Sequence, residues 1–350
     1  EVKPMLEQTM RVDLKALYKD NFWDGTRVLV TGAAGMIGSE LAELLVAHGA
    51  IVTAVDNFER GKMENLESIK DKIKIIAADM SNFGPALDIC QGQDVVFNMA
   101  AKVTSIEYNA EHHGTMFFKN MQLMSVPLEA ARRAGVPLFT QASTVCVFGH
   151  SVPIPTTETA ADDCHPEETN EGYGYAKLMG EKLALWYAKE YGMSIAITRY
   201  SNAYSDTRDY FDWETSHVIP ALIRKNMERD VVEIWGSGEQ RREFLFAKDA
   251  AYASMLVAEH GQGKGPINIG AGKNISINEL NDLVQSVLGV SKPVTHTYNK
   301  PTGHDERLTD NSKLKEICNW VPETALRNGV EKAVSWYIKN EGLFLAPPMT

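Results

Sequence analysis

The sequence is poor in cysteine and in long hydrophobic runs, and its basic residues do not outnumber the acidic ones. The four cysteines (Cys90, Cys146, Cys164 and Cys318) lie far apart, and no two have the CxxC spacing of a zinc or disulfide-exchange site. No apolar run approaches the roughly 20 residues that span a bilayer, and no signal peptide is recognisable. A formal net charge of -11 disfavours a nucleic-acid or anionic membrane surface as partner. We therefore expect reduced thiols, no metal site, no nucleic-acid or membrane partner and a cytoplasmic location.

What is present is ordinary for a globular protein: 350 residues, of which 44% are hydrophobic and 23% charged. From Arg27 onward, short apolar runs such as RVLVT, IVTAVD, DVVFN and SIAITRY alternate with amphipathic patterns such as SELAELLVAHG and KLMGEKLALWYAKEYG. Strand–helix alternation of this kind predicts a parallel sheet, here of six or seven strands, with helices on both faces.

The alternation changes after about residue 200, and the length suggests two domains. We expect an N-terminal extension at 1–24, a first domain from 25–200 plus about 244–270, and a second α/β domain from about 201–243 plus 271–345. The polar and aromatic stretch SNAYSDTRDYFDWETSH is too long for a tight turn, and such loops usually carry function. Because the second domain is interleaved with the first, we expect a ligand cleft between them.

A glycine-rich turn follows the first strand. Gly32, Gly35 and Gly38 form a GxxGxxG pattern at the start of a helix. Glycine permits the tight turn and lets backbone N–H groups approach a pyrophosphate at the helix N-terminus. A glycine triplet alone is weak evidence, but its place between a strand and a helix predicts a dinucleotide site in the first domain.

The end of the second strand indicates which dinucleotide binds. Asp56 stands there, where its carboxylate can accept hydrogen bonds from the adenosine ribose hydroxyls, and this favours NAD. Arg60 and Lys62 follow closely and can instead hold a 2′-phosphate, so NADP stays open. The other expected cofactor residues follow the same turn or the ends of neighbouring strands: Met36, Ile37, Asn57, Asp79, Met80, Ala100 and Lys102.

A tyrosine and a lysine are the candidate catalytic pair, and both are also expected to contact the cofactor. Tyr173 and Lys177 stand at i and i+4 of a predicted helix, and hence on one face. A lysine ammonium near a phenol favours the phenolate, because an opposite charge lowers the pKa of an acid. Such a tyrosine can remove a proton from a substrate hydroxyl while hydride leaves the carbon.

From Arg27 to about Asn340 the sequence resembles the extended short-chain dehydrogenase/reductase family of nucleotide-sugar epimerases, dehydratases and reductases. TGAAGMIG matches the family's cofactor turn, YGYAK its Tyr–Lys pair, and STVCVFG its SSxxVYG strand end. The resemblance implies a Rossmann-type doubly wound α/β fold with a smaller, interleaved C-terminal α/β domain for a nucleotide-diphosphate sugar. It also implies a homodimer formed through helices around 115–134 and 174–191.

The same match assigns further catalytic residues. Thr144 takes the place of the hydroxyl that hydrogen-bonds the substrate alcohol, with Ser143 ranked second for substrate contact. Cys146 stands where the GDP-fucose synthase and GDP-mannose 3,5-epimerase branch places cysteine, and SHVIP puts His217 at the place of the basic residue that works with it across the sugar ring. Taken singly, the two residues can equally be a small buried thiol and a polar loop histidine.

Further matches imply contacts to the substrate. Lys225, Arg242 and Arg307 match basic positions that hold the diphosphate in relatives, and Asn202 matches an asparagine that meets the sugar or its phosphate. The planar fork of arginine suits such a role because it pairs two oxygens at once. Two departures from the branch are the NAD-type Asp56, where GDP-fucose synthases usually take NADPH, and the stretch SDTRDYFDWETSH in place of a GPHDNF-type loop.

The leading hypothesis is therefore an NAD-dependent nucleotide-sugar epimerase that acts on a GDP-hexose or related sugar through a transient 4-keto intermediate. In this hypothesis Cys146 and His217 invert carbon 3, carbon 5 or both. The alternatives are an NAD(P)H-dependent reductase of 4-keto nucleotide sugars, a simple 4-epimerase that needs neither Cys146 nor His217, and a ligand sensor that retains the fold. The nucleotide base and the sugar stay open.

Overall fold

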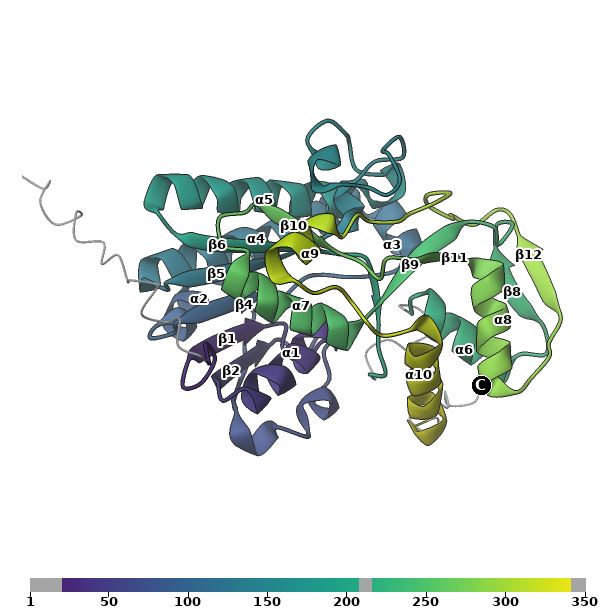
Figure 1. Ribbon diagram of the computed structural model, residues 1–350, viewed down its shortest axis with the longest axis horizontal. Coiled ribbons are helices and arrows are strands. Elements are labelled where there is room, and N and C mark those ends of the chain that lie inside the picture. The colour runs from purple at the N-terminus through teal and green to yellow at the C-terminus, as the bar shows by residue number, and fades with distance from the viewer. Residues whose placement is uncertain (1–20, 208–215, 341–350) are drawn as a thin grey trace, which may run out of the picture.

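The computed structural model describes residues 21–207 and 216–340 (Figure 1). Most of the expected N-terminal extension, most of the stretch SDTRDYFDWETSH and the end of the expected second domain lie outside these residues. In the described part of the chain, no helix is long and apolar enough to cross a membrane.

Seven parallel strands form the large sheet, in the order β10-β6-β5-β4-β1-β2-β3. They are β1 (Arg27–Thr31), β2 (Ile51–Asp56), β3 (Lys74–Ala77), β4 (Val95–Asn98), β5 (Leu138–Thr144), β6 (Ser194–Tyr200) and β10 (Pro266–Ile269). The strand order reverses direction between β1 and β4, and in open α/β sheets ligands bind beyond the strand ends at this point. The sheet confirms the predicted Rossmann-type architecture.

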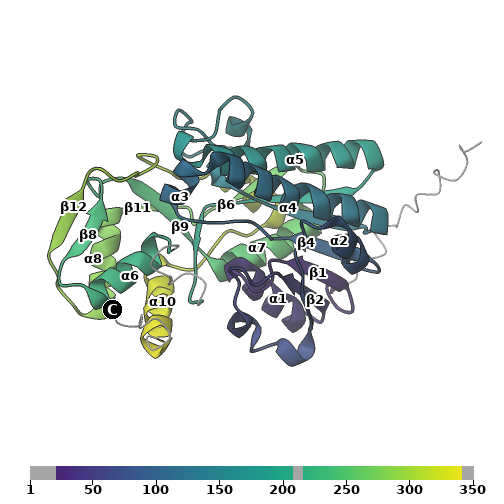
Figure 2. The ribbon, with the colours of Figure 1, turned by 180° about the vertical axis from the view of Figure 1, so that it is seen from behind.

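Helices cover both faces of the large sheet (Figures 1 and 2). The helices α1 (Met36–Ala47) and α7 (Ala247–His260) pack on one face, and α2 (Phe83–Cys90), α4 (His113–Ala134) and α5 (Glu171–Tyr191) pack on the other. Each face buries its own cluster of apolar side chains, which explains why the strands are apolar on both sides. The predicted helices on both faces are thus confirmed.

Two smaller sheets follow the large one. One contains β7 (Asn202–Tyr204), β9 (Arg241–Phe246) and β11 (Asn274–Ser276), and the other contains β8 (Val232–Trp235) and β12 (Val294–Thr297). Residues 266–269 were expected in the first domain and join the large sheet as β10. Residues 244–246 were expected in the same domain but belong to β9 of a small sheet. The division into a cofactor domain and a sugar domain stays a prediction.

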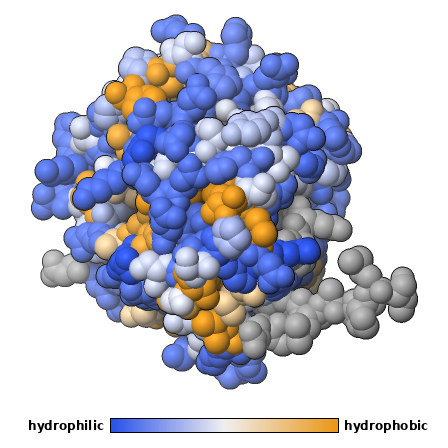
Figure 3. Space-filling view, turned by 90° about the vertical axis from the view of Figure 1, so that its right-hand side faces the viewer, coloured by the Kyte–Doolittle hydropathy of each residue, from blue (hydrophilic) through white to orange (hydrophobic). Residues whose placement is uncertain are grey.

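Four helices accompany the smaller sheets. They are α6 (Val218–Glu228), α8 (Ile277–Leu288), α9 (Ser312–Cys318) and α10 (Leu326–Asn340), while α3 (Ile106–Glu111) precedes α4. Side chains of α6, α8 and α10 share one buried cluster with β7, β8 and β9, whereas α9 packs on α7. The outer face of this region is mostly hydrophilic, with a few small hydrophobic patches (Figure 3).

Candidate active site

A cleft of about 490 Å³ opens beyond the carboxyl ends of the central strands. Every residue expected to contact the cofactor lines this cleft: Gly32, Gly35, Met36, Ile37, Gly38, Asp56, Asn57, Asp79, Met80, Ala100, Lys102, Tyr173 and Lys177. Residues from the turns after β1, β2, β3 and β4 thus meet the catalytic helix α5 in one cavity. Its place at the switch point between β1 and β4 is the place that the sheet topology predicts.

Glycine is required in this turn because neighbouring backbone atoms leave no room for a Cβ. Gly32 has a φ of 62°, and a Cβ there would lie 2.9 Å from the backbone of Ala100. A Cβ on Gly38 would lie 2.1 Å from the carbonyl oxygen of Gly32. The cap residue of α1, Gly35, has no side chain to satisfy the first N–H groups of the helix, so these face the cleft as donors for an anion. The turn therefore fits a dinucleotide pyrophosphate.

The carboxylate of Asp56 is held in place by the backbone around it. Its Oδ2 accepts a hydrogen bond from the Ala34 amide at 3.0 Å, and its Oδ1 accepts one from the Phe58 amide at 2.9 Å. Burial raises its pKa, and these hydrogen bonds act in the opposite direction. Each oxygen retains a second lone pair for a ribose hydroxyl. The guanidinium of Arg60 bonds the carbonyl of Val103 instead, and this arrangement fits NAD.

The candidate catalytic pair lines the same cleft. Lys177 is 2% exposed, and its Nζ lies 5.8 Å from the ring centre of Tyr173 and donates to the carbonyl oxygen of Ala142 at 3.0 Å. Burial lowers the pKa of Lys177 to about 8, although Glu181 and Cys146 oppose the shift. At neutral pH the ammonium therefore still carries its proton, beside the phenol whose proton loss it favours.

The two hydroxyls that end β5 have different surroundings. The Thr144 hydroxyl accepts a hydrogen bond from the Cys146 amide at 3.2 Å, which leaves its proton available to a substrate. The Ser143 hydroxyl donates to the carboxylate of Glu181, and the residue lines the cofactor cleft. This difference agrees with the ranking of Thr144 before Ser143. The substrate contacts of both residues stay predictions.

Cys146 lies between the cofactor cleft and the smaller sheets. It stands in a single turn, Val145–Val147, that follows β5. It lies near enough to Lys177 and to Arg242 on β9 to interact electrostatically with both. Helix α5 packs on this turn so tightly that a Cβ on Gly174 would lie 2.5 Å from the Cys146 carbonyl oxygen. Its position is therefore fixed relative to the catalytic helix.

His217 is the cap residue of α6. Burial, assisted by the nearby charge of Arg60, lowers its pKa to about 3. The imidazole is thus neutral at physiological pH. Its position near Arg60 puts it by the cofactor loop, and its placement across the sugar from Cys146 stays a prediction.

Besides Ser143, four residues are predicted to contact the substrate, and all four donate hydrogen bonds within the protein. Arg242 donates to the Thr302 carbonyl at 2.7 Å, and burial together with Arg307 lowers its pKa to about 10. Lys225 donates to the carbonyl of Glu233 at 2.8 Å. Asn202 donates to the Glu243 carbonyl at 3.0 Å.

Arg307 donates to the carbonyl of Val145 at 2.8 Å and pairs with Glu167 at 3.0 Å. The contacts of all four residues to a diphosphate stay predictions.

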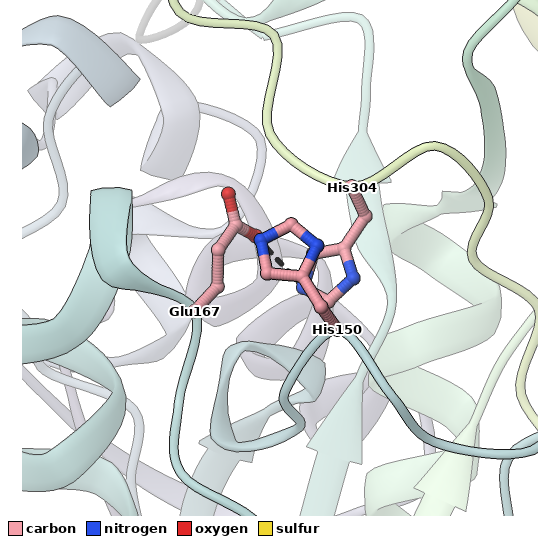
Figure 4. A group of neighbouring side chains, drawn as sticks. All are labelled: His150, Glu167 and His304. Atoms are coloured by element: carbon pink, nitrogen blue, oxygen red, sulfur yellow. Dashed lines mark ion pairs between the residues drawn. The ribbon is translucent and has the colours of Figure 1, made fainter.

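A cluster that the sequence analysis missed lies beside Cys146. His150, Glu167 and His304 come from three separate segments and point toward one another (Figure 4). The Nε2 of His304 lies 2.8 Å from Glu167, which also pairs with Arg307. Burial alone would raise the pKa of Glu167, but its bonds to His304 and Thr169 and the charge of Arg307 lower it to about 2.

The cluster has the ligand types of a metal site but not the geometry. The rings of His150 and His304 stack with centres 4.1 Å apart and planes 24° apart. An imidazole binds a metal in its own ring plane at about 2 Å, and two planes stacked in this way do not meet at such a point. The neighbouring charge of Arg307 also opposes a cation. We interpret the cluster as a hydrogen-bonded ion pair that joins Glu167 and Arg307 to the turn of Cys146.

A second missed group lies behind the catalytic lysine. Glu181 and Arg199 form a buried ion pair at 2.6 Å. The spacing of Glu181, four residues after Lys177, was the one signal in the sequence that indicated a third residue on the same helix face. For the His150 cluster the sequence holds no such signal, because its members are brought together only by the tertiary fold.

Comparisons with known proteins agree with this site. The model of the "NAD dependent epimerase/dehydratase family" matches residues 28–270. A GDP-L-fucose synthase of Sinorhizobium fredii is 31% identical over 91% of this chain and 97% of its own. A GDP-mannose 3,5-epimerase of Arabidopsis thaliana is 28% identical over 92% and 85%.

A solved structure of UDP-glucose 4-epimerase with UDP-glucose, from Thermotoga maritima, superposes with a TM-score of 0.82 at 27% identity, over 90% of this chain and 100% of that chain. These matches confirm the resemblance stated from the motifs and the NAD-type cofactor site. The chain belongs to the NAD dependent epimerase/dehydratase family.

Proposed function

We propose that the chain is an NAD-dependent nucleotide-sugar epimerase that acts on a GDP-hexose or a related sugar through a transient 4-keto intermediate. The observation that carries this proposal is that Tyr173 and Lys177 line the same cleft as the glycine turn and Asp56. When bound, NAD supplies the hydride acceptor. The Tyr173 phenolate takes the proton of the 4-hydroxyl, Lys177 stabilises that phenolate, and the Thr144 hydroxyl orients the substrate oxygen.

Cys146 and His217 would carry the inversion. A ketone at carbon 4 acidifies the hydrogens on carbons 3 and 5, because an enolate can then hold the charge. In the proposal Cys146 and the neutral imidazole of His217 exchange a proton with opposite faces of the sugar, and Tyr173 returns its proton when carbon 4 is reduced again. The likeness to GDP-mannose 3,5-epimerase and the position of Cys146 directly after β5, packed against α5, support this step.

The second candidate function is an NAD(P)H-dependent reductase of 4-keto nucleotide sugars, which the 31% identity to a GDP-L-fucose synthase favours. The similarity to a UDP-glucose 4-epimerase supports a third, the simple 4-epimerase. In all three, Tyr173 and Lys177 have the same role. They differ in whether the cofactor is consumed and in whether Cys146 is needed.

Solvent exchange separates the three candidates. With GDP-mannose as the probe in D₂O, the proposed epimerase incorporates deuterium at carbon 3 or 5 and leaves the ratio of NAD⁺ to NADH unchanged. The Cys146→Ser variant should lose this exchange while still reducing bound NAD⁺. A wild-type enzyme that exchanges nothing with GDP-mannose or other GDP- and UDP-hexoses, yet reduces a 4-keto sugar with NAD(P)H, would replace the proposal by the reductase.

We also propose that the chain forms a homodimer through α4 and α5. These helices lie side by side on the outside of the large sheet (Figure 2). Phe118 on α4 is 59% exposed and Trp186 on α5 is 58% exposed, and Phe117 and Tyr191 on the same helices are also exposed. Large aromatic side chains exposed together on one pair of helices are typical of a protein interface.

A further inference from the structure

Helix α5 carries a third polar residue in line with the catalytic pair. Tyr173, Lys177 and Glu181 follow one another at intervals of four, so they form one row on the helix face. Glu181 is only 1% exposed. A carboxylate is seldom buried so completely unless other groups hold its charge.

Two residues from the large sheet hold the Glu181 carboxylate. Arg199 on β6 donates to both of its oxygens, at 2.8 and 2.6 Å, and Arg199 itself is 3% exposed. Ser143 on β5, which pairs with Arg199 in the sheet register, donates its hydroxyl to the same carboxylate. Arg199 also donates to the carbonyl of Glu158 at 2.7 Å. The carboxylate is therefore fixed in position.

Buried ion pairs are weak evidence for stability, because apolar residues of the same volume often serve as well. What distinguishes this pair is its neighbour. Lys177 is anchored on the carbonyl of Ala142, and Ser143, the next residue in β5, is anchored on Glu181. Two adjacent residues at one strand end thus anchor the ammonium and the carboxylate.

The groups around Lys177 come from five elements. Tyr173 and Glu181 lie on its own helix, Cys146 on the turn after β5, and Arg199 on β6 behind Glu181. The Met124 sulfur on α4 lies 3.7 Å from Nζ, and the Ala142 carbonyl belongs to β5. Among these groups, Glu181 is the carboxylate, and burial of the ammonium would otherwise favour the neutral amine.

We propose that Glu181 is a positioning residue whose carboxylate, held by Arg199 and Ser143, keeps Lys177 protonated beside Tyr173 at neutral pH. The inference rests on the proposed role of Tyr173 and Lys177 in hydride transfer. It also changes the interpretation of Ser143, whose hydroxyl supports Glu181 and is not a substrate ligand. Glu181 itself touches neither cofactor nor sugar in this account and acts only through Lys177.

The test uses two variants that break the same ion pair from opposite sides. Glu181→Gln removes the negative charge, and Arg199→Met removes the positive one. In the holoenzyme labelled with [¹³C]lysine, the Lys177 resonance, assigned by its loss in Lys177→Arg, is titrated with pH. We expect the Lys177 titration to move down by about one pH unit in Glu181→Gln and up in Arg199→Met, since a nearby negative charge raises the pKa of an ammonium and a nearby positive charge lowers it. Damage to the packing alone would not give opposite shifts.

If Arg199→Met fails to fold, the double variant Glu181→Gln/Arg199→Met replaces it. Without either charge, Lys177 should titrate at higher pH than in Glu181→Gln alone, where Arg199 is left unpaired. Equal titration of Lys177 in the wild type and in Glu181→Gln would overturn the inference.

Activity provides the second readout. The alkaline limb of the pH profile for NAD⁺ reduction should move to lower pH in Glu181→Gln. A rise of KM for the sugar in Ser143→Ala with an unshifted Lys177 titration would contradict the support role of Ser143. The NMR titration needs no substrate, so a wild-type protein that transfers no hydride would contradict the proposed function and still leave the inference on Glu181 measurable.

Discussion

The Nζ of Lys177 lies 3.0 Å from the carbonyl oxygen of Ala142. This hydrogen bond joins the catalytic helix α5 to the end of β5, two residues before Thr144. Because this contact joins the two segments that carry the candidate catalytic residues, the distance between the Tyr173 phenol and the Thr144 hydroxyl is set by regular secondary structure and not by a loop. Sites built on such elements are held more precisely than sites on loops.

Replacing Tyr173 by phenylalanine should reduce hydride transfer by about 10²–10⁴-fold, the usual contribution of a positioned acid or base. Binding of NAD⁺ should change little, since the ring remains in place. The matched control is Tyr175→Phe on the same helix, which removes only a hydrogen bond to His165 at 2.6 Å. Absorbance of NADH during a single turnover measures both variants. An equal loss in the two would contradict the assignment of Tyr173.

The glycine turn gives a sharp steric prediction. Gly38→Ala puts a methyl group 2.1 Å from the carbonyl oxygen of Gly32, and we expect a cost of about 1–3 kcal/mol, divided between stability and NAD⁺ affinity. Gly84→Ala in α2 is the control, because nothing lies within 4 Å of its new Cβ. That variant should be neutral or more stable by about 0.5–1 kcal/mol. Calorimetric titration with NAD⁺ and thermal unfolding distinguish the two.

The Glu167 ion pair should stabilise the fold in a pH-dependent way. Its pKa of about 2 in the folded protein lies below the ordinary 4.5, so the stabilisation is present above about pH 4.5 and is lost as the pH falls toward 2. Glu167→Gln should therefore lower the free energy of unfolding at pH 7 by about 3 kcal/mol, and by much less at pH 3. Urea unfolding of this variant and of Glu168→Gln, at the exposed neighbouring position, provides the comparison. A pH-independent difference would contradict the account.

The dimer is tested by one charge at the proposed interface. Trp186→Glu places a carboxylate where the exposed indole would be buried against a second copy, and we expect it to convert the dimer to monomers. Ile338→Glu on α10, a residue that is 49% exposed away from α4 and α5, should not. Sedimentation velocity measures both. A wild-type monomer, or a Trp186→Glu dimer, would rule out this interface.

The sequence predicts those parts of the site that depend on local spacing. The glycine turn, Asp56 at a strand end and the Tyr173–Lys177 pair each follow from residues a few positions apart, and the structure brings them to one cleft. The parallel sheet follows from strand–helix alternation for the same reason.

What depends on side chains that meet across the fold is not predictable in this way. Arg307 was expected at the substrate diphosphate, but its pairing with Glu167, 140 residues away in the sequence, is decided by tertiary contacts. His150 and His304 stack for the same reason, and no spacing indicates it. Residues 244–246 likewise belong to the small sheet because β9 pairs with β7. The hydrophobic pattern of β9 alone does not indicate which sheet the strand joins.

The decisive measurement is mass spectrometry of the dinucleotide that the purified protein releases on denaturation, with no cofactor added beforehand. Internally balanced oxidation and reduction predicts tightly retained NAD⁺, about one per chain. An empty protein that binds NADPH more tightly than NADH would contradict the role of Asp56 and replace the epimerase by the reductase.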